Sequence, residues 1–366
     1  MMRTKPPFRA DHVGSLLRSA TIQDARKKRE SGEFSADQLR EIEDREIAAV
    51  IKKQEDVGMK AVTDGEYRRS WWHFDFLGGL DGVDIVSSDQ GIQFQGRETK
   101  AQGIEVTGKL GFSDHPMTAH FRFLAEHALG VPKMTIPSPS VLHFRQDDAA
   151  RSKVYPDIEE FFDDLGQAYA DAVRAFYDSG CRYLQLDDTV WAYLCSEVEL
   201  EKARERGHDT NGLDQRYARA INAALAAKPN DMTITMHVCR GNFRSTWISE
   251  GGYEPVAEIV LDGLDLDGYF FEYDTERAGG FEPLRFLPKG DKVVVLGLVT
   301  SKFGELEDRD EVKRRIYEAG KFVDLDQLCL SPQCGFASTE EGNVLAEDQQ
   351  WAKLREINEI ANEVWG

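Results

Sequence analysis

The stretch Met232-Thr-Ile-Thr-Met-His-Val-Cys239 shows most directly how this chain folds. Met232 to Met236 is a short and nearly unbroken apolar run, which is typical of a parallel strand covered by helices on both faces. His237 and Cys239, two side chains that bind metals well, stand where this strand ends. Because residues i and i+2 of an extended chain point to the same side, both side chains can reach one ion.

Similar apolar runs recur along the chain and alternate with amphipathic segments. The strands are predicted at residues 9–13, 60–63, 131–136, 183–186, 232–236, 268–271, 292–296 and 327–330. The clearest helix lies between Asp157 and Gly180, where apolar residues fall on one face and both ends carry cap signals. Further helices are expected at residues 35–57, 214–227, 253–261, 309–319 and 347–364.

Eight strands that alternate with helices predict an α/β fold of the (β/α)8 TIM barrel type. An open doubly wound sheet is the alternative. We expect a single domain over residues 1–366, because α/β barrels commonly reach this length. Residues 71–130, approximately, form a long Gly-rich insertion with alternating patches, and they predict an antiparallel excursion after strand two that packs on the barrel top.

The charge of the chain excludes some classes of partner. Its 45 basic and 65 acidic residues give a formal charge of −20, which would repel nucleic acids and anionic membranes. No stretch approaches the roughly 18 apolar residues of a membrane span, and the first 17 residues lack the apolar core of a signal peptide. We therefore expect a cytoplasmic protein with reduced cysteines. The oligomeric state stays open, a homo-oligomer included.

Reactive side chains gather at the predicted strand ends, where barrel enzymes carry their chemistry. They are His12, Glu66, Asp187, His237, Cys239, Glu272 and Cys334. Two thiolates, an imidazole and a carboxylate, from His237, Cys239, Glu272 and Cys334, would favour Zn²⁺ over a hard cation such as Mg²⁺. Glu272 would be the exchangeable ligand, which leaves when a substrate thiol arrives. The alternative for a buried cysteine is a core residue, the role expected of Cys181, Cys195 and Cys329.

Several motifs in the right order resemble the cobalamin-independent methionine synthase family. They are His12-Val-Gly-Ser15, Asp64-Gly-Glu66, Leu184-Gln-Leu-Asp187, His237-Val-Cys239 and Ser331-Pro-Gln-Cys-Gly335. The resemblance implies a (β/α)8 barrel with zinc on the four residues named above, and a methyltransferase that acts on homocysteine. It also implies that Glu66 and Asp187 bind the substrate ammonium group. His12 and Ser15 would belong to the substrate site, with backbone near Ser15 at the carboxylate.

The chain departs from the family pattern in ways that leave the methyl donor open. Residues 297–302, Gly-Leu-Val-Thr-Ser-Lys, lack the histidine that the longer synthases carry there, so Lys302 is the candidate for a substitute acid or an anion partner. The tryptophan motif that binds folate is not evident. The donor would be methyltetrahydrofolate or another methyl donor. The region of Trp71 and Trp72 would exclude water and place the donor, and the candidate walls for a flat donor are Phe74, Phe76, Trp191 and Trp247.

Three alternatives remain beside methyl transfer to homocysteine. The chain also resembles zinc-dependent epoxyalkane–coenzyme M transferases, which would imply another thiol and an alkyl electrophile. A non-catalytic zinc- or thiol-binding barrel is the second alternative, although structural zinc sites are closed by four strong ligands. A metal-free barrel resembling uroporphyrinogen decarboxylase is the third. It would use arginines such as Arg68 and Arg69 to hold carboxylates, and would give the two cysteines no role.

Overall fold

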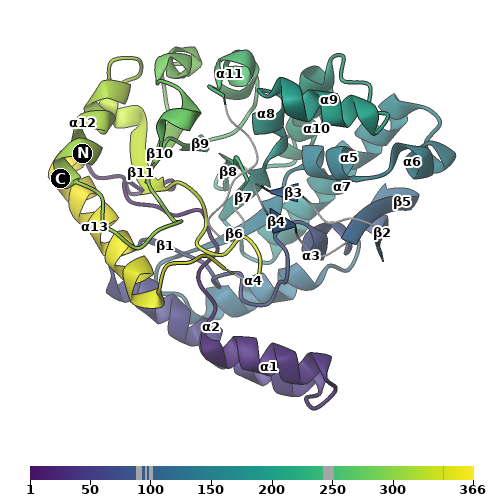
Figure 1. Cartoon of the computed structure of the whole chain (residues 1–366), viewed down its shortest axis with the longest axis horizontal. Coiled ribbons are helices and arrows are strands. Elements are labelled where there is room, and N and C mark those ends of the chain that lie inside the picture. The colour runs from purple at the N-terminus through teal and green to yellow at the C-terminus, as the bar shows by residue number, and fades with distance from the viewer. Residues whose placement is uncertain (88–92, 95–96, 99–101, 242–250, 341) are drawn as a thin grey trace.

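The computed structural model describes all residues except 88–92, 95–96, 99–101, 242–250 and 341. Its centre is a curled parallel sheet of seven strands in the order β1-β6-β7-β8-β9-β10-β11, with helices packed around it (Figure 1). The strands are β1 (Ala61–Val62), β6 (Val131–Pro137), β7 (Tyr183–Asp188), β8 (Thr233–Val238), β9 (Gly268–Glu272), β10 (Val293–Val299) and β11 (Leu328–Pro332). The predicted α/β fold of the TIM barrel type is confirmed.

The first predicted strand, residues 9–13, forms one parallel bridge from Ala10 to β11 in place of a full strand. The Asp11 carboxylate accepts hydrogen bonds from the backbone N–H groups of Phe8 and His12, at 3.1 and 2.8 Å. These bonds take the place of regular pairing with a neighbouring strand. The segment still spans the space between β11 and the loop after β1, where Thr63 Oγ1 donates to the carbonyl of Gly14 at 2.6 Å.

The helices follow the strands and are fixed by local signals at their ends. In the described residues they are α1 (Ala20–Glu30), α2 (Ala36–Asp56), α3 (Phe74–Leu77), α4 (Pro116–His127), α5 (Pro139–Arg145), α6 (Asp148–Val154), α7 (Ile158–Asp178), α8 (Val190–Tyr193), α9 (Glu197–Glu205), α10 (Leu213–Leu225), α11 (Glu254–Leu261), α12 (Arg309–Ala319) and α13 (Glu347–Trp365). Helix α2 starts with a capping box between Ser35 and Gln38. Helix α7 starts where the Asp157 carboxylate accepts from the N–H of Glu159.

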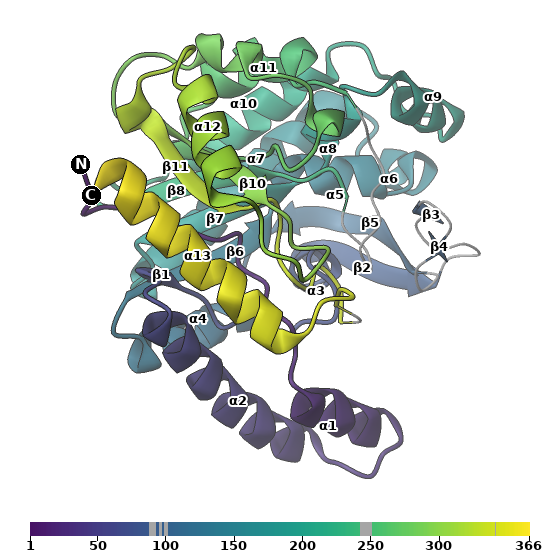
Figure 2. The ribbon, with the colours of Figure 1, turned by 60° about the vertical axis from the view of Figure 1, so that its left-hand side comes forward.

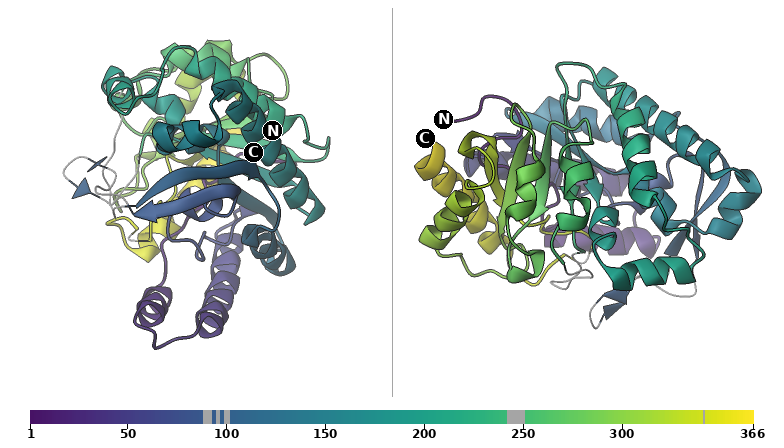
Figure 3. Two further views of the ribbon diagram at one scale, coloured as in Figure 1. Left: turned by 90° about the vertical axis from the view of Figure 1, so that its right-hand side faces the viewer. Right: turned by 90° about the horizontal axis from the view of Figure 1, so that it is seen from above.

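The insertion after β1 contains the expected antiparallel strands. They form two pairs, β2 (Asp81–Ser87) with β5 (Gln102–Gly111), and β3 (Gln93–Phe94) with β4 (Arg97–Glu98). The β2–β5 pair lies on the side of the molecule away from α12 and α13 (Figures 1 and 3). It joins the helices through Leu110, whose N–H donates to the hydroxyl of Tyr155 at 2.7 Å.

The two chain ends lie side by side, while α1 and α2 project from the body as a pair (Figure 2). The Arg9 guanidinium stands 5.2 Å from the ring of Trp365 and so joins the two ends. Among the described helices, none combines the length and apolarity that a membrane span requires.

Candidate metal centre and substrate pocket

The carboxyl ends of the parallel strands bring the predicted reactive residues together. Asp187 on β7 stands in register with His237 on β8, and Cys239 follows β8 directly. Glu272 is the last residue of β9, and Cys334 lies two residues beyond β11. Because parallel strands all end at one edge of the sheet, residues far apart in the sequence meet there.

His237, Cys239, Glu272 and Cys334 form one buried cluster, in which one ligand atom from each residue lies within 4.8 Å of the others. The two Sγ atoms stand 3.5 Å apart. Two sulfurs that each lie about 2.3 Å from a tetrahedral zinc ion would be about 3.8 Å apart. Nδ1 of His237 lies 3.3 Å from the carbonyl oxygen of Phe270, and its buried Nε2 has no hydrogen-bond partner among the described residues. These donors fit a soft divalent metal ion.

A second layer of contacts fixes the carboxylate of the cluster. Glu272 is fully buried; its Oε1 accepts from the N–H of Arg240 at 2.8 Å and its Oε2 from Nε2 of Gln333 at 3.0 Å. The Oε1 atom of Gln333 in turn accepts from Nζ of Lys302. Outer contacts of this kind orient metal ligands and tune their basicity.

The electrostatics of the cluster favour a bound cation. The thiol of Cys239 donates to Cys334, which holds the pKa of Cys334 well below its ordinary value and raises that of Cys239. Burial lowers the pKa of His237, but the nearby Cys334 outweighs burial and raises it to about 9. Burial and the charge of Cys334 raise the pKa of Glu272. The raised pKa values of Cys239 and Glu272 show that a second and a third anion beside Cys334 are disfavoured in this dry site, and a bound cation would stabilise their ionised forms.

The cluster opens into a pocket of about 580 Å³. His237, Cys239 and Cys334 line its metal-binding side, and Glu66 and Asp187 lie on its wall. The other lining side chains include Ser15, Arg69, Trp71, Trp72, Arg145, Thr189, Tyr193, Ser338 and Thr339. A concave site with a few convergent polar groups beside perturbed cysteines is a typical substrate site.

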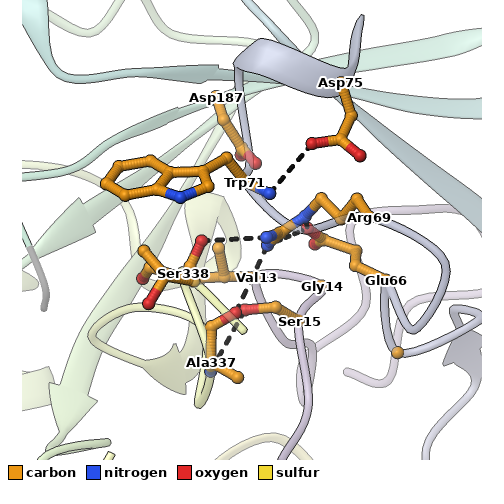
Figure 4. A network of polar contacts seen from close by, with 12 residues as sticks. Val13, Gly14, Ser15, Glu66, Arg69, Trp71, Asp75, Asp187, Ala337 and Ser338 are labelled. Carbon is orange, nitrogen blue, oxygen red and sulfur yellow. Dashed lines mark hydrogen bonds and ion pairs between the residues drawn. The ribbon is translucent and has the colours of Figure 1, made fainter. Parts of the chain in front are cut away.

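Two carboxylates in this pocket differ in their environment. Burial raises the pKa of Asp187 to about 7, with a further contribution from the charge of Glu66, although Nε2 of Gln185 donates to Asp187 at 2.7 Å. Glu66 is paired with the guanidinium of Arg69 (Figure 4). The pocket therefore holds one carboxylate that is already paired and one whose ionised form a cation, such as a primary ammonium group, would stabilise.

The remaining predicted site residues fall in different places. Ser15 lines the pocket, where its Oγ accepts from the N–H of Ala337 at 3.3 Å. His12 is buried with 1% of its surface exposed, and its carbonyl accepts from Nζ of Lys133 at 2.6 Å. Lys302 is also buried and forms an ion pair with Asp274 at 3.3 Å beside its contact with Gln333. Neither His12 nor Lys302 is among the described residues that line the pocket.

The aromatic residues also separate into wall and core. Trp71 and Trp72 line the pocket, although Trp71 also belongs to the hydrophobic core; Phe74, Phe76 and Trp191 lie in that core and are not among the described lining residues. Trp247 lies outside the described residues. The sequence reasoning did not identify Arg145 and Tyr193, which lie on α5 and α8 and are joined by a hydrogen bond of 2.9 Å.

Comparison with known proteins places the chain in a family. The uncharacterized protein YxjH of Bacillus subtilis is 58% identical over 99% of this chain and 96% of its own length. The crystal structure of a putative vitamin-B12 independent methionine synthase from Listeria monocytogenes is 46% identical, with a TM-score of 0.81 over 100% of both chains. The 5-methyltetrahydropteroyltriglutamate–homocysteine methyltransferase of Listeria innocua is 22% identical over 95% of this chain, which spans 42% of that longer protein.

The family model that matches is described as the catalytic domain of the cobalamin-independent synthase, and it covers residues 8–362. The resemblance inferred from the five sequence motifs, and with it the class of enzyme, is confirmed by this match. Since the match covers nearly the whole chain, the protein belongs to the family of the cobalamin-independent synthase catalytic domain.

Proposed function

We propose that this chain is a zinc-dependent methyltransferase that methylates the sulfur of homocysteine and so forms methionine. One observation carries the proposal: four side chains that could hold a metal form one cluster, and three of them, His237, Cys239 and Cys334, line a pocket that Glu66 and Asp187 also line. The names of two relatives, a putative methionine synthase and a homocysteine methyltransferase, agree with this chemistry.

Zinc would be held by His237, Cys239, Glu272 and Cys334. Two sulfurs and an imidazole select a soft or borderline ion over Mg²⁺ or Ca²⁺. When bound, zinc would lower the pKa of a substrate thiol, so that a thiolate is available at neutral pH. Glu272 accepts hydrogen bonds from Arg240 and Gln333, so its carboxylate would have partners after it leaves a metal, which suits the role of the exchangeable ligand.

The amino-acid end of the substrate would lie against the opposite wall. An ammonium group between Glu66 and Asp187 would relieve the repulsion that helps raise the pKa of Asp187. Ser15, held by the N–H of Ala337, lines the same pocket and would lie near the substrate carboxylate. This wall orients the thiol for attack, and such positioning accounts for a large part of the rate of bimolecular transfer.

We propose that a methylated folate or another methyl donor enters along the wall that contains Trp71, Trp72 and Tyr193. Aromatic faces suit a flat ring, and Arg145 beside them suits an anionic group. In the transfer step a sulfur–carbon bond forms and the bond between the methyl group and the donor breaks. The electron pair of that bond stays with the donor atom, which is then protonated.

Lys302 was a candidate for the acid that protonates the donor. Its contacts with Asp274 and Gln333 support a different role, because Gln333 is the residue that donates to Glu272. We propose that Lys302 orients Gln333 and that it thereby supports the metal centre.

Metal analysis of cysteine variants tests the proposal. Cys239→Ser and Cys334→Ser should each lose most of the bound zinc and nearly all methyl transfer to homocysteine, because serine is a poor zinc ligand. Cys195→Ser is the matched control, since Cys195 lies outside the cluster and donates to the carbonyl of Trp191. Full zinc content and full turnover in either cluster variant would refute the assignment of the site.

A further inference from the structure

Arg69 connects two loops of the pocket through one guanidinium group. Its Nε and Nη2 atoms contact Oε2 of Glu66 in the loop after β1. Its Nη1 donates to the carbonyl of Ser338 at 2.8 Å and its Nη2 to that of Ala337 at 3.3 Å, both in the loop that follows Cys334 (Figure 4). Arg69 is buried, with 8% of its surface exposed, and lines the pocket.

The loop that Arg69 holds has an unusual backbone. Gly65 and Glu66 adopt positive φ angles, 68° and 58°, and for Glu66 this left-handed conformation is unfavourable. The turn aims the Glu66 side chain at Gly14, where a Cβ atom would stand 2.5 Å from its Oε1. Arg18 supports the same turn, because its Nη2 donates to the carbonyls of Glu66 and Arg69, each at 2.9 Å. The orientation of Glu66 is therefore imposed by its surroundings.

Arg69 also balances the charge of the pocket. Glu66 and Asp187 both line it, and two carboxylates that face the same space repel each other. The guanidinium of Arg69 offsets the charge of Glu66, so that of these three side chains one negative charge, on ionised Asp187, remains for a cationic group. Because the same guanidinium holds the backbone after Cys334, it also fixes Glu66 relative to the cysteine cluster.

We infer that Arg69 is a positioning residue that makes the pocket selective for thiols with an ammonium group. It holds the ammonium-binding Glu66 at a set place relative to the cysteines, so that amine recognition and thiol placement occur together. This inference rests on the proposed function and deepens it, since it assigns the amine selectivity to a residue outside the predicted site.

Titration calorimetry with the zinc-loaded protein tests the inference without a methyl donor. The two probes are homocysteine and 4-mercaptobutanoate, which is the same molecule without the amino group. In Arg69→Met the preference for homocysteine over 4-mercaptobutanoate should fall about tenfold or more, the size of a lost charge-assisted interaction. Affinity for 4-mercaptobutanoate and zinc content should stay within about twofold of the wild type.

Two further variants separate positioning from folding. Arg68→Gln is the matched control, because Arg68 pairs with Asp44 of α2 at 2.5 Å, and it should keep the wild-type preference. Arg69→Lys keeps the positive charge but lacks the planar guanidinium group, and it should lose part of the preference for homocysteine. It also serves as the test if Arg69→Met does not fold.

Three outcomes would overturn the inference in distinguishable ways. An unchanged preference in both Arg69 variants would refute it while the proposed function stands. A parallel loss of zinc and of affinity for both thiols would show a purely structural role. A wild-type protein without preference for homocysteine would refute the amine recognition itself, and the inference with it.

Discussion

Replacement of Gly14 by alanine is expected to displace Glu66 in the pocket, because it adds one Cβ atom. Gly14 has a φ angle of +147°, and a Cβ atom there would meet Oε1 of Glu66 at 2.5 Å and Cγ2 of Thr135 at 2.7 Å. The backbone conformation alone costs an alanine about 1–3 kcal/mol. The overpacking adds about 1–3 kcal/mol and displaces Glu66.

Gly290→Ala is the matched control for this prediction. Gly290 has a similar φ angle of +141°, but a Cβ atom there would meet no atom of the described part of the chain within 4 Å. Urea unfolding should therefore show a loss of about 1–3 kcal/mol for Gly290→Ala and about 2–6 kcal/mol for Gly14→Ala. Only Gly14→Ala should weaken homocysteine binding in calorimetry. Equal losses of stability in the two variants, with unchanged homocysteine affinity, would refute the placement of Glu66.

The remaining predictions concern the ammonium site and the second layer of the cluster. Asp187→Asn should weaken homocysteine about tenfold or more but 4-mercaptobutanoate less than about twofold, and equal losses would remove the ammonium assignment. Burial and the charge of Glu66 raise the pKa of Asp187 to about 7, and only the ionised carboxylate pairs with an ammonium group. The preference for homocysteine should therefore rise between about pH 6 and pH 8 in the wild type and stay flat in Asp187→Asn. Gln333→Leu should lower zinc affinity by about 10- to 100-fold in a chelator competition assay, because it removes the donor to Glu272. Gln327, whose amide donates to the carbonyls of Pro288 and Lys292 ahead of β10, gives the control: Gln327→Leu should keep wild-type zinc affinity, and equal effects would contradict the role of Gln333.

Long elements with local end signals could be predicted well from the sequence. Helix α12 (Arg309–Ala319) matches its predicted bounds, because Asp308 accepts from two backbone N–H groups at its start and Gly320 follows its end. The single bridge at Ala10 could not be distinguished from a full strand by its sequence. The hydrogen bonds of the Asp11 carboxylate, which replace regular strand pairing there, form only in the folded protein.

The candidate site, too, could be predicted from the sequence only in part. His237 and Cys239 were accessible to sequence reasoning because they share one strand end, and parallel strands bring other strand ends to the same edge. Arg145 and Tyr193 were missed because they lie on the short helices α5 and α8, which have no strong periodic pattern. Trp191 was assigned to the pocket wall but packs edge-on against Tyr217 in the core, a contact that only the tertiary structure determines.

The central claim, zinc that activates a substrate thiol, is tested most directly by zinc-edge X-ray absorption on the purified protein with and without homocysteine. We expect a shell with two sulfurs at about 2.3 Å, from Cys239 and Cys334, that gains a third sulfur when homocysteine is added. An unchanged shell with homocysteine, or a protein that binds no zinc, would contradict the claim.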